Sequence, residues 1–383
     1  MADALTVFYV VSDKPHHSEL KWGRDVFKTF GFVHGGGGNI MSLTHSAFKQ
    51  AFEDGVEEAS RIMITGHVGP DDDSISSVTS LYLYLVKHTE HTLDSVDIVY
   101  EAEHSDRWES FEAYEVIDFV DDLTEATSGY DCFFFLDANE PSRFTNNDGP
   151  LGANGERFCI DHHPADEYHF DHNWVEADRA ATADMIYELC YDDREVSTKE
   201  AEHILLGIVG DTGMFRYVKP ENASVFATAE SLVREGGIKM ESFGEKTGGV
   251  DPNAFHVFTE LMGNAVITEV GGWPTMLYSY VHEADIRGCS DEERSSGAHM
   301  FVSWAKRVDD IGWGFVYTPR SNDKVAASYR SVPGSVNVQD LAERMDVGGG
   351  HVRAAGARFE EMPAEDAIDY TLEWMEDHDP VLE

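Results

Sequence analysis

We predict an α/β fold: an N-terminal domain built on a parallel sheet with helices on both faces, and a smaller C-terminal α/β domain. Two observations predict this fold. Short apolar runs alternate with amphipathic helical patterns along much of the chain, and the alternation resumes after a glycine-rich, polar stretch around 236–268. Buried strands separated by helices indicate a parallel sheet covered on both faces. A length of 383 residues also fits two domains.

The N-terminal domain should contain residues 43–245. Its strands are expected in apolar runs at 61–65, 96–100, 132–136 and 157–160. Its helices are expected at 43–60, 74–87, 182–189, 198–209 and 223–235. The run CFFFL at 132–136 has no polar residue, which predicts a fully buried strand.

We place a linker at 246–267 and a C-terminal domain at 268–383. This domain should contain strands at 275–281, 312–318 and 324–329, and helices at 292–305, 338–345 and 364–377, with one further helix at 253–266. Residues 1–42 form an N-terminal extension with one strand-like run and a glycine-rich loop that matches no phosphate-binding motif. We expect this extension either to cap the sheet or to mediate association. A homodimer is therefore one possible state of the protein.

Charge and composition exclude several classes of protein. Lys and Arg number 28 against 72 Asp and Glu, a net charge of −44, which argues against a broad basic face that grips long nucleic acid or an extended duplex. Acid spread along the whole chain favours a halophilic, haloarchaeal protein. No membrane span or basic leader is found in the sequence, so we expect a cytoplasmic protein. The four scattered cysteines indicate buried thiols and not a disulfide framework.

Acidic residues and histidines follow the predicted strands where each strand ends. They are His67, Asp71 and Asp73, then Asp137, then Asp161, His162 and His163, and finally Asp211 at the end of a helix. Ligands bind at the carboxyl ends of the strands in an open parallel sheet, so we expect these side chains to meet. Imidazole and carboxylate ligands suit Mn²⁺ or a similar divalent ion, and their number suggests two ions.

Each of these signals also has a plain structural explanation. Asp73 could cap the helix that follows it, the adjacent histidines could belong to a polar loop, and Asp211 could form a turn. Their joint occurrence, each at the end of an element, favours a metal site.

Six motifs together give the chain a family resemblance. They are His67-x-x-Pro70-Asp71-x-Asp73, Asp137 followed by Arg143, Asp161-His162-His163, GDTGMFRY with Asp211, SYRS with Arg330, and GGGHVRAAG at 348–356. On these motifs, residues 43–360 resemble the DHH phosphoesterase superfamily, in the DHH–DHHA1 branch that includes RecJ nucleases and NrnA-type oligoribonucleases. The family commonly has glycine where this chain has Asp72.

The resemblance implies a role for each residue. His67 and Asp71 would bind one metal ion, Asp73, His162 and Asp211 the other, and Asp137 would bridge the two. His163 would contact the scissile phosphate, and Asp161 would orient a histidine. The family's two ions, Mn²⁺ with Mg²⁺ or Co²⁺ as alternatives, would activate water and stabilise charge on the phosphate.

The resemblance makes the first domain the DHH catalytic domain and the second the DHHA1 substrate-binding domain, with the active-site cleft between them. Glycines let backbone N–H groups approach an anion, and Arg and His add charged donors. The substrate-binding residues would be Arg330, Gly348, Gly349, Gly350 and His351.

The expected function is hydrolysis of short oligonucleotides or pAp, which need only a compact site. Three alternatives stay open: a RecJ-like 5′–3′ exonuclease on single strands, a phosphodiesterase acting on cyclic dinucleotides or pApA, and a catalytically inactive binding scaffold. The complete ligand set argues against the scaffold, and no membrane partner is expected.

Overall fold

The computed structural model describes residues 41–383 except 153, 192–193, 306, 321–323 and 361. The chain divides into two compact units between Ile238 and Lys239. Nearly all of the predicted N-terminal extension lies outside the described residues, so the structure tests neither the strand nor the glycine-rich loop expected there.

The N-terminal unit contains a six-stranded sheet in which every neighbouring pair is parallel, in the order β3-β2-β1-β4-β5-β6. The strands are β1 (Ile62–Gly66), β2 (Val96–Glu101), β3 (Ile117–Val120), β4 (Cys132–Leu136), β5 (Glu156–Asp161) and β6 (His172–Val175). The predicted parallel sheet is confirmed. Strands β3 and β6 were not predicted, because IDFV and HNWV are short and mix polar with apolar residues.

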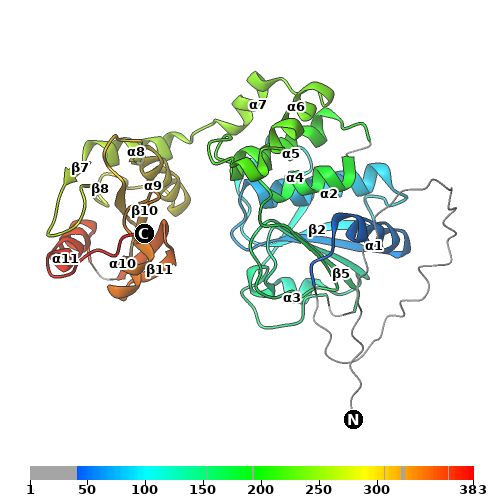
Figure 1. Cartoon of the computed structure of the whole chain (residues 1–383), viewed down its shortest axis with the longest axis horizontal. Helices are drawn as coiled ribbons and strands as arrows, with labels where there is room; N and C mark the ends of the chain where they lie inside the picture. The colour runs from blue at the N-terminus through cyan, green and yellow to red at the C-terminus, as the bar shows by residue number, and fades with distance from the viewer. Residues whose placement is uncertain (1–40, 153, 192–193, 306, 321–323, 361) are drawn as a thin grey trace, which may run out of the picture. The chain divides into compact units, whose positions relative to one another are not determined.

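Helices cover both faces of this sheet (Figure 1). They are α1 (His45–Glu58), α2 (Asp72–His88), α3 (Leu123–Ala126), α4 (Thr182–Tyr191), α5 (Thr198–Asp211) and α6 (Val225–Glu235). Alternate residues of each strand point to opposite faces. Phe134 of β4 contacts Phe52 of α1, and Phe158 of β5 contacts Phe48 of α1. Phe133, the neighbour of Phe134 in β4, points to the other face and packs in a cluster with Leu123 of α3.

The C-terminal unit contains a mixed six-stranded sheet in the order β11-β12-β10-β9-β8-β7. The strands are β7 (Val266–Thr268), β8 (Met276–Tyr280), β9 (Trp313–Pro319), β10 (Lys324–Ser331), β11 (Gly348–His351) and β12 (Ala354–Glu360). The helices are α7 (Met240–Thr247), α8 (Pro252–Gly263), α9 (Asp291–Ala305), α10 (Val338–Arg344) and α11 (Ala364–Glu376). The predicted second, smaller α/β region is confirmed.

The C-terminal sheet has an apolar core on each face. Phe315 and Tyr317 of β9 pack with the residues of α10 and α11, whereas Val316 between them packs with α8 and α9. Because α8 contributes Val257 and Leu261 to this second core, the segment predicted as a linker at 246–267 contains an element of the C-terminal unit.

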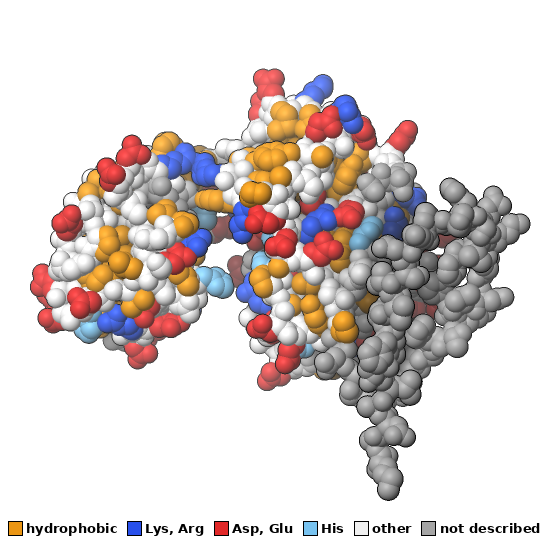
Figure 2. All heavy atoms as spheres, viewed as in Figure 1, with side chains coloured by type: hydrophobic (Ala, Val, Ile, Leu, Met, Phe, Trp, Pro, Cys, Tyr) orange, Lys and Arg blue, Asp and Glu red, His pale blue; other side chains and the backbone are white. Residues whose placement is uncertain are grey.

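Acidic side chains are scattered over the face of both units seen in Figure 2 and do not gather in one patch. Within the described residues, no helix is both long and apolar enough to cross a membrane.

Candidate metal centre and phosphoester site

The sheet topology of the N-terminal unit creates a switch point between β1 and β4. The chain runs outward from β1 to β2 and β3, then returns to β4 on the other side of β1. Gly66 and Leu136, the last residues of β1 and β4, are paired in register. His67 and Asp137 follow them directly, so both lie at the crevice where ligands bind in open α/β sheets.

Asp71 and Asp73 have different local roles at the start of α2. Asp71 is the N-cap of α2, and its Oδ1 accepts hydrogen bonds from the N–H groups of Asp73 and Ser74. The carboxylate of Asp73 accepts the N–H groups of Thr182 at 2.6 Å and Ala183 at 2.9 Å, in the first turn of α4. Asp73 therefore joins α2 to α4 and does not cap its own helix.

Asp137 lies almost fully buried at the centre of the site. Its backbone has a φ of 65°, a left-handed conformation that costs energy in a residue other than glycine and that clusters at functional sites. Its N–H donates to Ile160 O of β5, and its Oδ1 accepts the hydroxyl of Thr182 at 2.9 Å. These bonds tie Asp137 to β5 and to the first turn of α4.

His67 and His162 both turn their Nε2 atoms toward the carboxylates. Nδ1 of His67 lies 3.1 Å from Val68 O, and Nδ1 of His162 lies 3.4 Å from Arg179 O. A backbone carbonyl at Nδ1 favours the tautomer with its proton there, which leaves the Nε2 lone pair free to bind a metal ion.

The Nε2 atom of His162 is buried and has no hydrogen bond of acceptable geometry, although Asp211 Oδ2 lies only 2.9 Å away. Asp137 Oδ1 and Asp73 Oδ2 are 3.7 Å and 3.8 Å from the same atom. Buried polar atoms normally have a hydrogen-bond partner. A buried imidazole nitrogen that lacks one and is surrounded by carboxylate oxygens is the environment expected of a metal ligand.

Asp211 is the last residue of α5, not part of a turn. Its approach depends on Gly207, one helical turn earlier. A Cβ at Gly207 would fall 2.6 Å from both Asp73 Oδ1 and the Ala183 side chain. Only glycine lets α5 pack this closely against α2 and α4.

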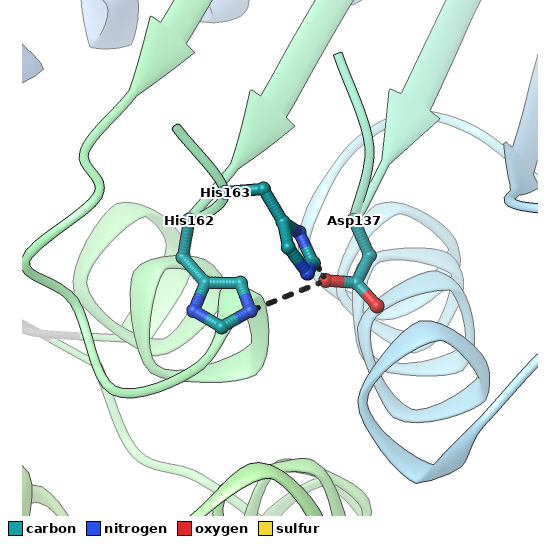
Figure 3. Close-up of side chains that lie close together, drawn as sticks. All are labelled: Asp137, His162 and His163. Atoms are coloured by element: carbon teal, nitrogen blue, oxygen red, sulfur yellow. Dashed lines mark ion pairs between the residues drawn. The ribbon is translucent and has the colours of Figure 1, made fainter. Parts of the chain in front are cut away.

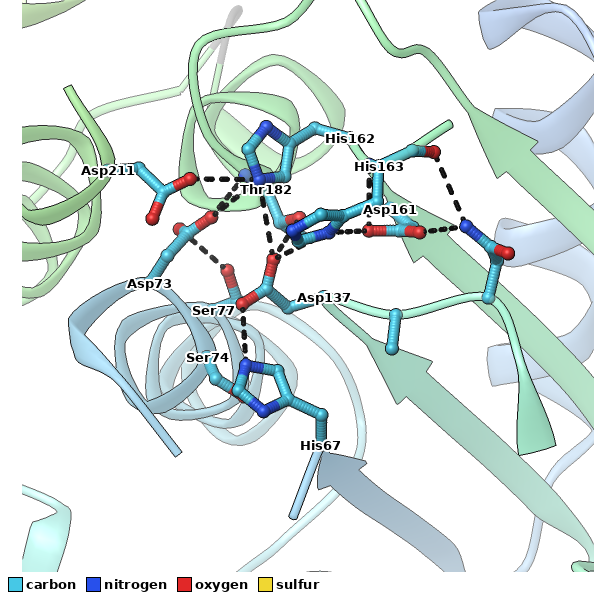
Figure 4. Close-up of polar contacts among 12 residues, drawn as sticks. His67, Asp73, Ser74, Ser77, Asp137, Asp161, His162, His163, Thr182 and Asp211 are labelled. Atoms are coloured by element: carbon cyan, nitrogen blue, oxygen red, sulfur yellow. Dashed lines mark hydrogen bonds and ion pairs between the residues drawn. The ribbon is translucent and has the colours of Figure 1, made fainter. Parts of the chain in front are cut away.

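The residues form two groups in which one ligand atom from each member lies within 4.8 Å of the others. The groups are His67, Asp71 and Asp137, and Asp73, His162 and Asp211. Asp137 is also grouped with His162 and His163, so it lies between the two sets (Figures 3 and 4). The structure therefore brings all six predicted metal ligands together, and their role as ligands, with Asp137 as a bridge, stays a prediction.

Burial and mutual repulsion of the carboxylates raise the pKa values of two aspartates at this site. Burial and then the negative charge of Asp211 raise the pKa of Asp73 to about 7, and burial with the charge of Asp73 raises that of Asp137 well above its usual range. Burial lowers the pKa of His162, but the nearby carboxylates of Asp211 and Asp73 outweigh it and raise the value to about 9. Divalent cations would remove this repulsion, so the donor set fits two metal ions.

The two predicted catalytic residues contact each other at the end of β5. Asp161 Oδ1 lies 2.8 Å from Nδ1 of His163, and His163 Nδ1 is 3.9 Å from Asp137 Oδ1. Asp161 is fully buried, whereas the His163 side chain is 52% exposed. His163 can therefore reach a substrate from a fixed position.

Three residues that no sequence motif indicates support this site. They are Thr182, which donates to Asp137; Asn139, whose amide donates to Asp161; and Arg179, whose carbonyl faces His162. Only for Asn139 does the sequence offer a signal, since it lies two residues after Asp137. The contacts of Thr182 and Arg179 depend on the tertiary fold.

Asp72, where the family commonly has glycine, contacts residues that are not part of the metal-ligand groups. Its carboxylate accepts the Trp108 Nε1–H at 2.8 Å and pairs with Arg107 at 2.6 Å. Asp72 thus fastens the segment after β2 to the start of α2, a role beyond general acid enrichment.

The predicted substrate-binding residues lie together at one end of the C-terminal sheet. Ala354 of β12 pairs with His351 of β11 on one side and with Arg330 of β10 on the other. GGGH is a short edge strand, and its first and third glycines let β11 approach β12: a Cβ at Gly350 would fall 2.6 Å from Ala354 O. Gly349 has only a Glu343 side chain at 3.9 Å, so it leaves open space.

Comparison with known proteins defines the class. Residues 61–208 match the DHH family, N-terminal domain, and residues 302–377 match the DHHA1 domain. The chain therefore carries a DHH family domain and a DHHA1 domain, which confirms the resemblance drawn from the motifs.

Particular relatives narrow the comparison. The chain is 26% identical over 245 residues to the bifunctional oligoribonuclease and PAP phosphatase NrnA of Bacillus subtilis, covering 62% of this chain and 72% of that protein. An exopolyphosphatase-related protein from Bacteroides fragilis has the same fold, with a TM-score of 0.72, 20% identity, and coverage of 88% of this chain and 99% of that one. RecJ of Thermus thermophilus, solved with Mn²⁺, matches at a TM-score of 0.51 and 13% identity, over 88% of this chain and 55% of RecJ.

Proposed function

We propose that this chain is a divalent-metal-dependent hydrolase of short oligonucleotides and of pAp. The observation that carries the proposal is the position of Asp137 between two groups of imidazole and carboxylate donors. The similarity to NrnA supports the substrate class. The net charge of −44 also favours a short substrate over a long strand, because few basic residues are available to follow a phosphate backbone.

Two metal ions, for which we propose Mn²⁺, would be held by His67, Asp71 and Asp137 on one side and by Asp73, His162, Asp211 and Asp137 on the other. Bound there, such ions lower the pKa of water and neutralise charge on the attacked phosphate. The protein's part is to hold the ligands rigidly: Asp73 is fixed by the first turn of α4, and Asp137 by Thr182.

His163 and Arg143 are proposed to bind the scissile phosphate. Asp161 accepts the Nδ1–H of His163, which leaves Nε2 to face the substrate. The backbone carbonyl of Arg143 accepts the Val68 N–H at 2.7 Å, which places this exposed arginine beside His67. An imidazole and a guanidinium both stabilise the charge that develops on the phosphate oxygens.

In the C-terminal unit, Arg330 and the strand Gly348–His351 are proposed to bind a second phosphate of the substrate. Their common position at one end of the sheet supports this role. Burial lowers the pKa of Arg330, whose Nη1 donates to Tyr329 O at 2.8 Å, so the side chain is held in place while it stays charged at neutral pH.

A substrate panel in high salt with Mn²⁺ tests the proposal. It contains pAp, a dinucleotide, a 5-mer, a 30-nucleotide single strand and a cyclic dinucleotide, with Asp137→Ala as the inactive control. We expect fast turnover of pAp and the short oligomers while the 30-mer is spared. Degradation of the 30-mer would support a RecJ-like exonuclease instead, and the absence of any Mn²⁺-dependent turnover would support a binding scaffold.

A further inference from the structure

The segment 212–219, with the sequence TGMFRYVK, directly follows the predicted ligand Asp211. It contains two basic residues and no acidic residue, in a chain with 72 acidic residues. Arg216 is exposed and makes no ion pair with any residue that the structure describes. An exposed positive charge without an ion-pair partner among the described residues, five positions after a predicted metal ligand, points to an anionic ligand.

The backbone of this segment is strained. Gly213, Met214 and Phe215 have φ values of 56°, 57° and 63°, so two bulky residues adopt the left-handed conformation that favours glycine. Thr212 holds the turn: its hydroxyl accepts the Phe215 N–H at 3.0 Å, and its carbonyl accepts the Tyr217 N–H at 3.0 Å. Strain of this kind persists where surrounding bonds enforce it, and it clusters at ligand-binding sites.

The strained turn exposes large apolar side chains. Met214 is 61% exposed and Tyr217 is 57% exposed, whereas the ring of Phe215 stacks on Phe226 with centroids 5.3 Å apart. Large apolar side chains that are exposed on the same turn can mark a binding surface.

Tyr217 packs on the turn that directly follows Asp211: its N–H donates to Thr212 O at 3.0 Å, and its ring rests on Gly213. A Cβ at Gly213 would fall 2.5 Å from Tyr217 Cε2, so the absence of a side chain there creates the space that the ring fills. Gly213 is two residues from Asp211, whose carboxylate is 2.9 Å from His162 Nε2. The exposed ring is therefore held against the turn that joins it to the predicted ligand Asp211.

We propose that Tyr217, with Met214 beside it, forms a platform on which a nucleobase of the substrate stacks, and that Arg216 binds a phosphate of the same nucleotide. Exposed aromatic rings interleaved with basic residues bind single-stranded nucleic acid without sequence preference, and each stacked base contributes about 1–3 kcal/mol. This inference rests on the proposed function and names the group that recognises the nucleoside part of the substrate.

The test compares a 5′-phosphorylated dinucleotide with the same molecule lacking its bases. For Tyr217→Ala we expect kcat/KM for the dinucleotide to fall about 5- to 150-fold, mainly through KM, while hydrolysis of the abasic analogue is unchanged. Tyr217→Trp should retain the wild-type KM, because an indole also stacks. Tyr370→Ala is the matched control, since Tyr370 is a tyrosine 43% exposed on α11. An equal loss on both substrates, or no loss on either, would overturn the platform.

A second readout does not depend on turnover. A dinucleotide that carries 2-aminopurine loses fluorescence when its base stacks on an aromatic ring. We expect quenching on binding to the wild-type protein and none with Tyr217→Ala; equal quenching with both proteins would overturn the inference. If the wild-type protein cleaves no substrate, the proposed function fails, and the fluorescence result alone then decides the platform.

Discussion

Asp161 holds the imidazole of His163 in a fixed orientation at the end of β5. Its Oδ1 lies 2.8 Å from Nδ1 of His163, while its other oxygen accepts the side-chain amide of Asn139. Both oxygens of the buried carboxylate are thus engaged, and the Nε2 atom of the half-exposed histidine stays free.

We predict that Asp161→Asn lowers kcat about 10- to 100-fold with little change in KM, because the orienting partner of His163 is altered. His163→Ala should lower kcat further, and the double variant should be no slower than His163→Ala alone. Steady-state kinetics of the three variants check this, with Asp94→Asn, at an exposed position, as control. Additive losses in the double variant would show that Asp161 acts independently of His163.

Gly207→Ala is expected to damage both stability and activity. The new methyl group would fall 2.6 Å from Asp73 Oδ1 and from the Ala183 side chain, so α5 must shift and carry Asp211 away from His162. Overpacking of this kind costs about 1–3 kcal/mol in unfolding free energy. Denaturant unfolding and turnover measure the two effects. Gly244→Ala in α7, which has open space around it, is the control and should be neutral or stabilising.

Glu101, at the carboxyl end of β2, predicts a pH dependence of stability. Burial alone would raise its pKa, but hydrogen bonds from Leu123, Thr145 and Asn146 outweigh burial and lower the value to about 2. Because the folded value lies below the ordinary 4.5, the stabilisation is complete above about pH 4.5 and is lost as the pH falls toward 2.

We therefore predict that Glu101→Gln destabilises the protein by about 1–3 kcal/mol at pH 7 and that the difference from wild type shrinks at acidic pH. The amide would place its NH₂ group opposite donors that now meet a carboxylate oxygen. Chemical denaturation at several pH values between 3 and 7 measures the difference. A gap that stays constant with pH would contradict the role assigned to the charge, and Glu360→Gln, an exposed pair with Lys324, serves as control.

Sequence patterns predicted the strands that are uniformly apolar, such as CFFFL, and the helices with a clear apolar face. The strand HNWV was missed because its composition does not indicate a strand. Its pairing with β5, a contact of the tertiary fold, determines its structure. Likewise, the sequence placed Asp73 and Asp137 at strand and helix ends but could not show that Thr182 contacts both, since that contact brings together residues more than 40 positions apart.

The most direct test of the account is the number of Mn²⁺ ions that the chain binds, measured by equilibrium dialysis together with the electron paramagnetic resonance spectrum. Asp137 is grouped with His67 and Asp71 and also with His162 and His163. If it bridges two ions, the chain should bind two Mn²⁺ ions with a spin-coupled spectrum, and Asp137→Ala should lose the coupling. A single Mn²⁺ per chain, or two uncoupled ions that Asp137→Ala leaves unchanged, would contradict the two-metal centre.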